Sequence, residues 1–333
     1  MGGDNPPQHF FSAILEAASQ LNSDYNLLVI ATKNVVDDLS SYIKTNLTCH
    51  HGACIDFLVA ADFIAMDEEP LKALRRKKGA SLILGVDLLK KNQLDAFVSC
   101  GNTGALIASA ALSLPLLPGI LRPALLVPLP TKKGPVAVLD VGGSVSCKAQ
   151  HLIQFAHLGA AYQQAMYGIE VPAVGLLNNG IESKKGTVEL QQVYESLRTS
   201  CLDTVARGTA PKMNFVGNIE GRDVFTGVVD VLITDGFTGN ILLKTAEGVA
   251  SFIFDALEGI VEQSASENIR EEFSSLKKQF NYTEYPGALI CGIDSVIIKV
   301  HGNASAQTML VSLLSAADCL HRKVIEKIAE KIL

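Results

Sequence analysis

The feature that most constrains the fold is a repeated order of segments: a short aliphatic run, then a polar loop, then a helical pattern. Five aliphatic runs stand out, at residues 27–30, 96–98, 136–139, 174–177 and 229–233. Continuous aliphatic strands that alternate with helices are typical of a mostly parallel sheet with both faces covered. The order therefore predicts an α/β protein with three layers, α/β/α, around a mostly parallel sheet.

Composition narrows the class of protein. Apolar residues make up 48% of the 333 residues, which allows a large core and argues against a disordered chain. The 28 Lys and Arg against 34 Asp and Glu leave a net charge of −6, which argues against a general nucleic-acid binder. Seven cysteines, scattered from Cys49 to Cys319, favour a reducing cytoplasm over a disulfide framework.

The uncharged stretch from residue 96 to residue 121 raises the alternative of a membrane span. Glycines such as Gly101 and prolines such as Pro115 interrupt it, and they favour a short strand, a loop and a helix instead. The opening residues, 1–4, lack the basic and apolar leader of a signal peptide. We therefore expect a soluble, cytoplasmic protein.

Two of the polar loops have the composition of anion sites. Gly101-Asn102-Thr103-Gly104 lies between a strand and a helix start, where backbone N–H groups bind anions. The alternative is an ordinary helix cap with a glycine turn. The second loop runs from Thr234 to Asn240, and Lys244 follows one turn later. Ligands bind at the carboxyl ends of parallel strands, so these loops are expected to form the site.

The known nucleotide motifs are missing from these loops. Neither the P-loop nor the Gly-x-Gly-x-x-Gly fingerprint occurs, which disfavours ATP and nicotinamide chemistry. The segment from Cys49 to Cys54 holds two cysteines and two histidines, but they are crowded and lack a second ligand pair. The sequence therefore predicts an enzyme with no cofactor and no metal.

One predicted helix carries a cluster of five cations, which we call the basic cluster. Its members are Lys72, Arg75, Arg76, Lys77 and Lys78. They are either a solvated face or a docking patch for an acidic partner.

Two longer helices are predicted from the spacing of apolar residues. The first runs from residue 70 to 91, with Leu71, Leu74, Leu82, Val86 and Leu89 buried, and the second runs from about residue 308 to 332.

The chain resembles the bacterial acyl-carrier-protein:phosphate acyltransferases (PlsX) almost end to end. The most specific segments are residues 98–105 and 215–223; the others lie at 1–4, 66–70, 122–124, 139–142, 175–178, 185–186, 235–240 and 299–302. The resemblance implies an isopropylmalate-dehydrogenase-like α/β fold with a helical arm. It divides the chain into a core over 1–258, the arm over 259–286, and a return to the core over 287–333.

The resemblance implies transfer of a long-chain acyl group from acyl-carrier protein to inorganic phosphate, in phospholipid synthesis. Asn102, Lys185, Asp235 and His301 are then the catalytic candidates. The phosphate- or substrate-binding candidates are Gly3, Asp4, Gly101, Thr103, Asn178, Thr238, Asn240 and Lys244. The basic cluster becomes the carrier docking site. A homodimer is implied, as is peripheral contact with the inner face of the membrane or with a downstream acyltransferase.

This sequence departs from the family pattern at several places. It lacks the strand that the family has before its Met-Gly-Gly-Asp. Ser144 replaces an Asn, Ser146 replaces an Asp, and Ile181 replaces a carboxylate. These changes keep a weakened enzyme or non-catalytic scaffold as one alternative. An acyl-CoA phosphotransacetylase is another, and an isopropylmalate-type dehydrogenase is disfavoured because its metal-binding carboxylates are missing.

The predicted arm carries a narrow apolar stripe. Ile269, Phe273, Leu276 and Phe280 recur at spacings of four, three and four, so they share one helical face. A membrane-seeking helix has a basic polar face, but here four glutamates outnumber three cations. The pattern therefore predicts that the arm packs against a second subunit.

Overall fold

The computed structural model describes residues 1–46, 52–206, 212–264, 266–280 and 287–332. These residues form two compact units. Unit 1 comprises residues 1–117 and 283–325, and unit 2 comprises residues 118–282 and 326–333. Unit 1 is thus built from two segments of chain, with nearly all of unit 2 inserted between them.

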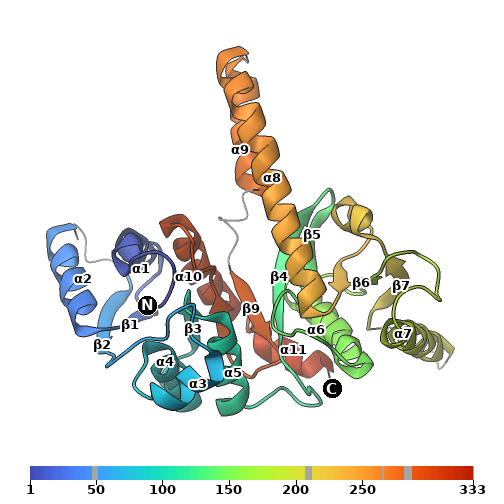
Figure 1. Cartoon of the computed structure of the whole chain (residues 1–333), viewed down its shortest axis with the longest axis horizontal. Coiled ribbons are helices and arrows are strands. Elements are labelled where there is room, and N and C mark those ends of the chain that lie inside the picture. The colour runs from blue at the N-terminus through green and yellow to red at the C-terminus, as the bar shows by residue number, and fades with distance from the viewer. Residues whose placement is uncertain (47–51, 207–211, 265, 281–286, 333) are drawn as a thin grey trace. The chain divides into compact units, whose positions relative to one another are not determined.

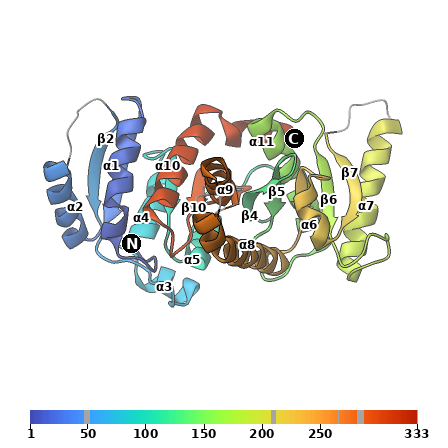
Figure 2. The same ribbon diagram turned by 90° about the horizontal axis from the view of Figure 1, so that it is seen from above.

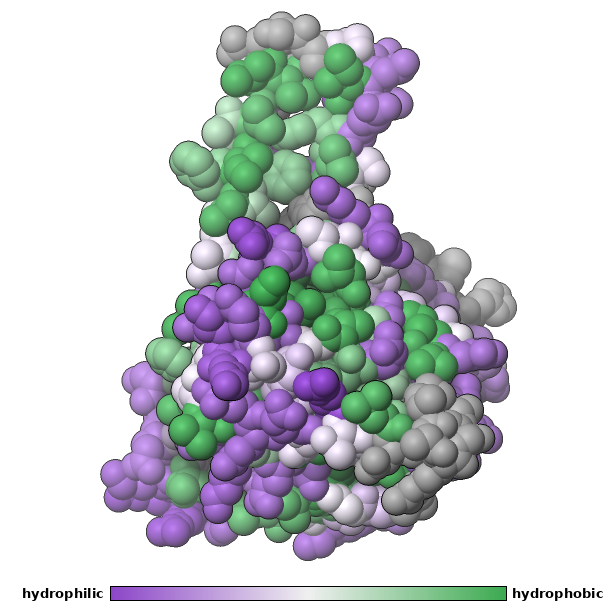
Figure 3. Space-filling view, turned by 90° about the vertical axis from the view of Figure 1, so that its right-hand side faces the viewer, coloured by the Kyte–Doolittle hydropathy of each residue, from purple (hydrophilic) through white to green (hydrophobic). Residues whose placement is uncertain are grey.

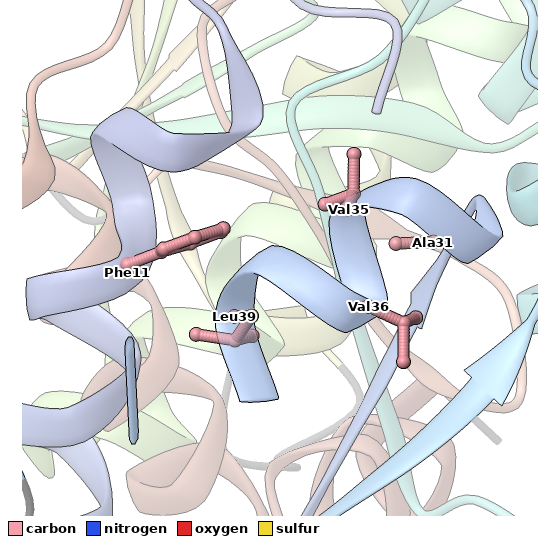
Figure 4. Close-up of a cluster of buried hydrophobic side chains, with 5 residues drawn as sticks. All are labelled: Phe11, Ala31, Val35, Val36 and Leu39. Atoms are coloured by element: carbon pink, nitrogen blue, oxygen red, sulfur yellow. The ribbon is translucent and has the colours of Figure 1, made fainter. Parts of the chain in front are cut away.

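Unit 1 begins with a 3-10 turn and a small parallel sheet. Its first elements are η1 (Pro7–Phe10), α1 (Phe11–Gln20), β1 (Asn26–Ala31), α2 (Lys33–Asn46), β2 (Cys54–Val59), α3 (Pro70–Arg76) and α4 (Ser81–Lys90). β1 pairs with β2 in parallel. Phe11, Ala31, Val35, Val36 and Leu39 form a buried cluster that joins α1, β1 and α2 (Figure 4).

The second part of unit 1 carries the strands that lead to the candidate site. It contains β3 (Ala96–Ser99), α5 (Thr103–Ser113), β9 (Ala288–Cys291), β10 (Val296–Lys299) and α10 (Ala306–His321). β10 lies between β3, with which it pairs in parallel, and β9, with which it is antiparallel. α10, from the second chain segment, packs against α1 and β3.

Unit 2 holds five strands in the order β4-β5-β8-β6-β7. The strands are β4 (Ala124–Thr131), β5 (Gly134–Leu139), β6 (Ala173–Leu177), β7 (Asn214–Ile219) and β8 (Val231–Ile233). β4 and β5 form an antiparallel hairpin, and β5, β8, β6 and β7 run in parallel. α6 (Ala149–Tyr167) packs on β5 and β8, and α7 (Val188–Ala206) packs on β7; η2 (Gly221–Thr226) contacts β4.

Two long helices of unit 2 form the arm. α8 (Gly236–Ser264) begins directly after β8, and α9 (Glu267–Phe280) returns alongside it (Figures 1 and 2). The rings of Phe254 and Phe273 meet edge to face at 5.7 Å, and Lys277 pairs with Glu258 at 2.6 Å. The predicted arm boundary at residue 259 falls inside α8, and residues 281–286 lie outside the described part of the chain.

All five aliphatic runs are strands, which confirms the main sequence prediction. Two helix predictions are wrong in their extent. The helix expected over residues 70–91 is two helices, because the backbone leaves the helical region at Lys77 and Ala80 pairs with Asp62. Leu71 is consequently exposed, whereas Leu74, Leu82, Val86 and Leu89 are buried as predicted.

The helix expected over residues 308–332 is also divided. α10 ends at His321, and α11 (Val324–Ile332) starts after Lys323, whose φ of 52° is left-handed. A positive φ in a residue with a side chain ends an α-helix, because the next turn cannot continue its hydrogen bonds.

Candidate active site

Asn102 lies in unit 1 at the start of α5, and its amide is fully engaged. Its Oδ1 accepts a hydrogen bond from the Ala105 amide at 3.0 Å, which is the geometry of an N-cap. Its Nδ2 lies 3.0–3.1 Å from the carbonyl oxygens of Ala65, Met66 and Glu68. Asn102 therefore ties the turn before α3 to the first turn of α5.

Three further segments meet at this end of β3 and β10. The Asp4 amide donates to the carbonyl of Gly302 at 2.8 Å. A Cβ on Gly3 would lie 3.2 Å from the Sγ of Cys100, so the opening residues pack against the β3–α5 loop. His301 follows β10 and is exposed. Unit 1 thus gathers Gly3, Asp4, Gly101, Asn102, Thr103 and His301 at one edge.

In unit 2 the corresponding edge is built around Asp140, which sequence analysis passed over. Asp140 follows β5 and is completely buried. Its Oδ1 accepts from the amides of Leu125 at 2.9 Å and Gly143 at 2.8 Å, and its Oδ2 accepts from the Ser144 hydroxyl at 2.7 Å. Burial raises the pKa of Asp140, and these hydrogen bonds oppose that rise.

Asp235 caps the first turn of α8. Its Oδ1 accepts from the Thr238 amide at 2.9 Å, and its Oδ2 accepts from the Thr238 hydroxyl at 2.7 Å. Asn240 is exposed and lies against Gly142, 3.6 Å from where a Cβ would sit. Lys244 pairs with Glu247 at 2.6 Å, one turn farther along the helix. The predicted residues Asp235, Thr238 and Asn240 therefore share the first turns of α8.

A third group lies at the ends of β6 and β7. Asn178 donates through Nδ2 to the carbonyl of Lys185 at 3.1 Å and to Oδ1 of Asn218 at 3.2 Å. Lys185 is exposed, with its Nζ 3.9 Å from Glu182. Asn218 is buried and donates to the carbonyl of Glu182 at 2.8 Å. Asn218 was overlooked as a candidate although it stands in one of the segments that carry the family resemblance.

The basic cluster separates into paired and unpaired cations. Lys77 donates to Glu68 at 2.8 Å, which raises the pKa of Lys77 and lowers that of Glu68. Lys72 pairs with Glu69 at 2.5 Å. In the described part of the chain, Arg75, Arg76 and Lys78 have no carboxylate within ion-pair distance, and all three are exposed.

No metal or membrane site emerges from the described residues. Among them, no three His, Cys, Asp or Glu side chains gather as metal ligands. Cys49, His50 and His51, which the sequence offers as possible metal ligands, lie outside the described part of the chain. Within the same residues, no helix combines the length and the hydrophobicity needed to cross a bilayer.

Comparison with known proteins identifies the family. A family model described as "Fatty acid synthesis protein" matches residues 1–327. The phosphate acyltransferase of Chlamydia felis is 36% identical over 334 residues, covering 100% of this chain and 97% of its own. The chain belongs to the phosphate acyltransferase family. The Thermoanaerobacter pseudethanolicus member is 38% identical, covering 100% of this chain and 95% of its own.

Solved structures support the fold of this phosphate acyltransferase. A phosphotransacetylase from Streptococcus pyogenes matches with a TM-score of 0.56 and 13% identity, covering 93% of this chain and 98% of its own. The EutD phosphotransacetylase of Staphylococcus aureus matches with a TM-score of 0.53 and 13% identity, covering 95% of this chain and 99% of its own. The predicted three-layer α/β/α fold with a mostly parallel sheet is confirmed.

Proposed function

We propose that this phosphate acyltransferase takes its acyl group from acyl-[acyl-carrier protein] and passes it to inorganic phosphate. The observation that carries the proposal is the first turn of α5. Asn102 satisfies the Ala105 amide, whereas the amides of Thr103 and Gly104, which the helix itself leaves unpaired, have no acceptor among the described residues. Such amides, with the helix dipole, favour an anion. The long acyl phosphate product would then enter phospholipid synthesis.

The chemistry needs no activated side-chain nucleophile. A phosphate oxygen attacks the thioester carbonyl, a tetrahedral oxyanion forms, and the C–S bond breaks to release the carrier thiolate. The enzyme's task is to hold the two reactants together and to stabilise the oxyanion. We assign anion contact in unit 1 to the α5 first turn and, separately, in unit 2 to Lys185 and Lys244. His301 would supply the proton that the thiolate takes up, and Asp235 and Asn240 would position substrate.

The direct test is product formation by the purified protein. Palmitoyl-carrier protein and inorganic phosphate should yield free carrier and an acyl phosphate that hydroxylamine traps as a hydroxamate. Palmitoyl-CoA in place of the carrier thioester tests the transacetylase alternative. Hydroxamate from the CoA thioester alone would reject the carrier as donor, and none from either thioester would favour the non-catalytic scaffold.

The unpaired cations at the C-terminal end of α3 are proposed as the carrier's docking site. Among the described residues, no carboxylate lies within ion-pair distance of Arg75 or Arg76, which end α3, or of Lys78, which follows it. Leu71, in the first turn of α3, is exposed. An acidic carrier would be drawn to such a patch, and a neighbouring apolar side chain would add desolvated contact. Lys77 is better assigned to structure, because it donates to Glu68 and to the carbonyl of Phe63 at 2.8 Å.

Reversing two of these charges should weaken carrier binding selectively. For Arg75→Glu with Arg76→Glu, we expect KM for acyl-carrier protein to rise about tenfold at low salt and to lose most of its salt dependence. The matched control is Lys90→Glu with Lys91→Glu, two exposed cations of the same unit. Equal KM values for both double variants would assign the α3 cluster to the solvated surface.

The arm is proposed as the contact with a second subunit. Its far part exposes Val249, Phe252, Ile253, Leu257 and Ile260 of α8 together with Ile269 and Leu276 of α9. Figure 3 shows apolar side chains gathered over the arm. A contiguous apolar surface of this kind marks an interaction site on a soluble protein. Phe273, in contrast, faces Phe254 within the hairpin, so its side chain supports the arm itself.

Phe252 is therefore a sharper probe of the dimer than Phe273. Its side chain is 73% exposed, so Phe252→Asp should leave the hairpin folded while placing a charge in the interface. We expect light scattering to show a dimer for the wild type and a monomer for the variant. Leu202→Asp, an exposed apolar position on α7, is the control that should stay dimeric. If Phe252→Asp stays dimeric but no longer sediments with anionic vesicles, the arm binds membrane instead.

A further inference from the structure

The hydroxyl of Ser144 links a buried carboxylate to the first amide of α8. It donates to Oδ2 of Asp140 at 2.7 Å, and it accepts from the Gly236 amide at 3.3 Å. The Sγ of Cys147 lies 3.0 Å away. Ser144 is itself buried, so water does not compete for these contacts. A single hydroxyl thus joins the loop after β5 to the helix after β8.

The direction of each hydrogen bond follows from the count of protons. Asp140 accepts from the Leu125 amide, the Gly143 amide and the Ser144 hydroxyl and also faces the Gly142 amide. A set made of donors alone is the environment of an ionised carboxylate. The only proton on the Ser144 oxygen therefore points at Asp140. The Gly236 amide and the Cys147 thiol must therefore both donate to the Ser144 oxygen, so Cys147 contributes its S–H. Burial raises the pKa of the Cys147 thiol, which keeps that proton in place.

The link is possible because two glycines let the loop and the helix touch. A Cβ on Gly236 would collide with the carbonyl oxygen of Ser144, and a Cβ on Gly239 would collide with the carbonyl oxygen of Asp140. The first turn of α8 therefore lies directly on the Asp140–Ser144 loop. Across this close contact the Gly236 amide donates its hydrogen bond to the Ser144 hydroxyl.

We propose that Ser144 is a positioning residue that fixes the direction of the α8 first turn, and with it the substrate-binding side chains of Thr238 and Asn240. The inference rests on the proposed binding role of that turn. Ser144 would thus have a function of its own, although it replaces the Asn of the family pattern. Ser144 itself touches neither reactant in this account.

Amide hydrogen exchange tests the link without requiring turnover. In Ser144→Ala the Gly236 amide loses its acceptor, and we expect its exchange to quicken about fivefold, since one net hydrogen bond is worth about 1 kcal/mol. The matched control is Ser312→Ala, which removes a fully buried serine hydroxyl that donates to the Thr308 carbonyl at 2.6 Å in α10. Unchanged exchange at Gly236 in Ser144→Ala would overturn the proposal.

Kinetics separates positioning from a loss of stability. Ser144→Ala should raise KM for phosphate about tenfold while KM for the acyl donor stays within about twofold, and Ser144→Thr should restore it. Faster exchange at Gly236 with an unchanged phosphate KM would overturn the positioning role. Absence of any acyl phosphate from the wild type would instead reject the proposed function, and the exchange result would still decide on the link.

The acid side of the pH profile gives a second readout. The Ser144 hydrogen bond lowers the pKa of Asp140, so Ser144→Ala should raise that pKa. A protonated Asp140 holds its amide partners less strongly, so the acid limb of the activity profile should move to higher pH. The charged or titratable groups around Cys147 in this network are Asp140, Asp235 and Arg122, and the Cys147 thiol, whose pKa is raised, stays protonated throughout the acid limb.

Discussion

Asn102→Ala is expected to lower turnover at least tenfold. The variant loses the N-cap of α5 and leaves three carbonyl groups of residues 65–68 without their shared donor. The cap alone is worth about 1 kcal/mol, and the orphaned carbonyls add a comparable cost. Because about 1.4 kcal/mol corresponds to a factor of ten in rate, displacement of the α5 amides from the reacting atoms should be visible in kcat.

A second substitution separates the two functions of Asn102. Asn102→Asp keeps an acceptor for the Ala105 amide but turns an oxygen toward the three carbonyls, so it should be slower than Asn102→Ala and should unfold at lower temperature. Asn26→Ala, which breaks a hydrogen bond to Asp56 on the surface of the same unit, should leave kcat unchanged. Wild-type turnover in a folded Asn102→Ala would remove Asn102 from the candidate site.

Gly239→Ala is expected to have the largest effect on stability. A methyl group there would meet the carbonyl oxygen of Asp140 and the side chain of Thr234, and both residues are buried. Overpacking against backbone costs about 3 kcal/mol or more, and the α8 first turn should separate from the loop after β5. Thermal unfolding and acyl phosphate formation should both report the loss.

The same helix provides the matched control for Gly239. A Cβ on Gly248 would meet nothing within 4 Å, so Gly248→Ala changes only the helix backbone. It should stabilise the protein by about 0.5–1 kcal/mol, because glycine loses more conformational freedom than alanine in a helix. If both variants unfold like the wild type, the close contact between α8 and the Asp140 loop is not present in solution.

The strands and the loops that follow them could be predicted from sequence because their signal is local. A buried parallel strand reads as an aliphatic run, and a loop between strand and helix reads as Gly, Asn and Asp. The runs before Cys100, Asp140 and Asn178 are therefore all strands of the structure. β2, β4, β7, β9 and β10 were not among the predicted runs, since their polar, proline or short segments give a weaker pattern.

The hydrogen-bond partners and packing contacts of the candidate residues could not be predicted, because they lie far away in the sequence. The Asn102 side chain donates hydrogen bonds to carbonyl groups about 35 residues earlier in the chain. The Ser144 hydroxyl accepts a hydrogen bond from an amide 92 residues later. Asp140 reads in the sequence as the end of a strand, yet it organises the loop that α8 rests on. Phe273 lies on the apolar stripe by spacing, but only the structure shows that it faces Phe254.

The division of unit 1 into two chain segments has a consequence for synthesis on the ribosome. Residues 1–117 emerge first, but β10, the neighbour of β3, and α10, which covers α1, belong to residues 283–325. The intervening 165 residues, from 118 to 282, take about 8–33 seconds to translate at usual rates. By the end of that interval unit 2 lacks only residues 326–333, whereas β3 in the first segment still lacks its parallel neighbour β10 and presents an unpaired strand edge, a feature that favours aggregation.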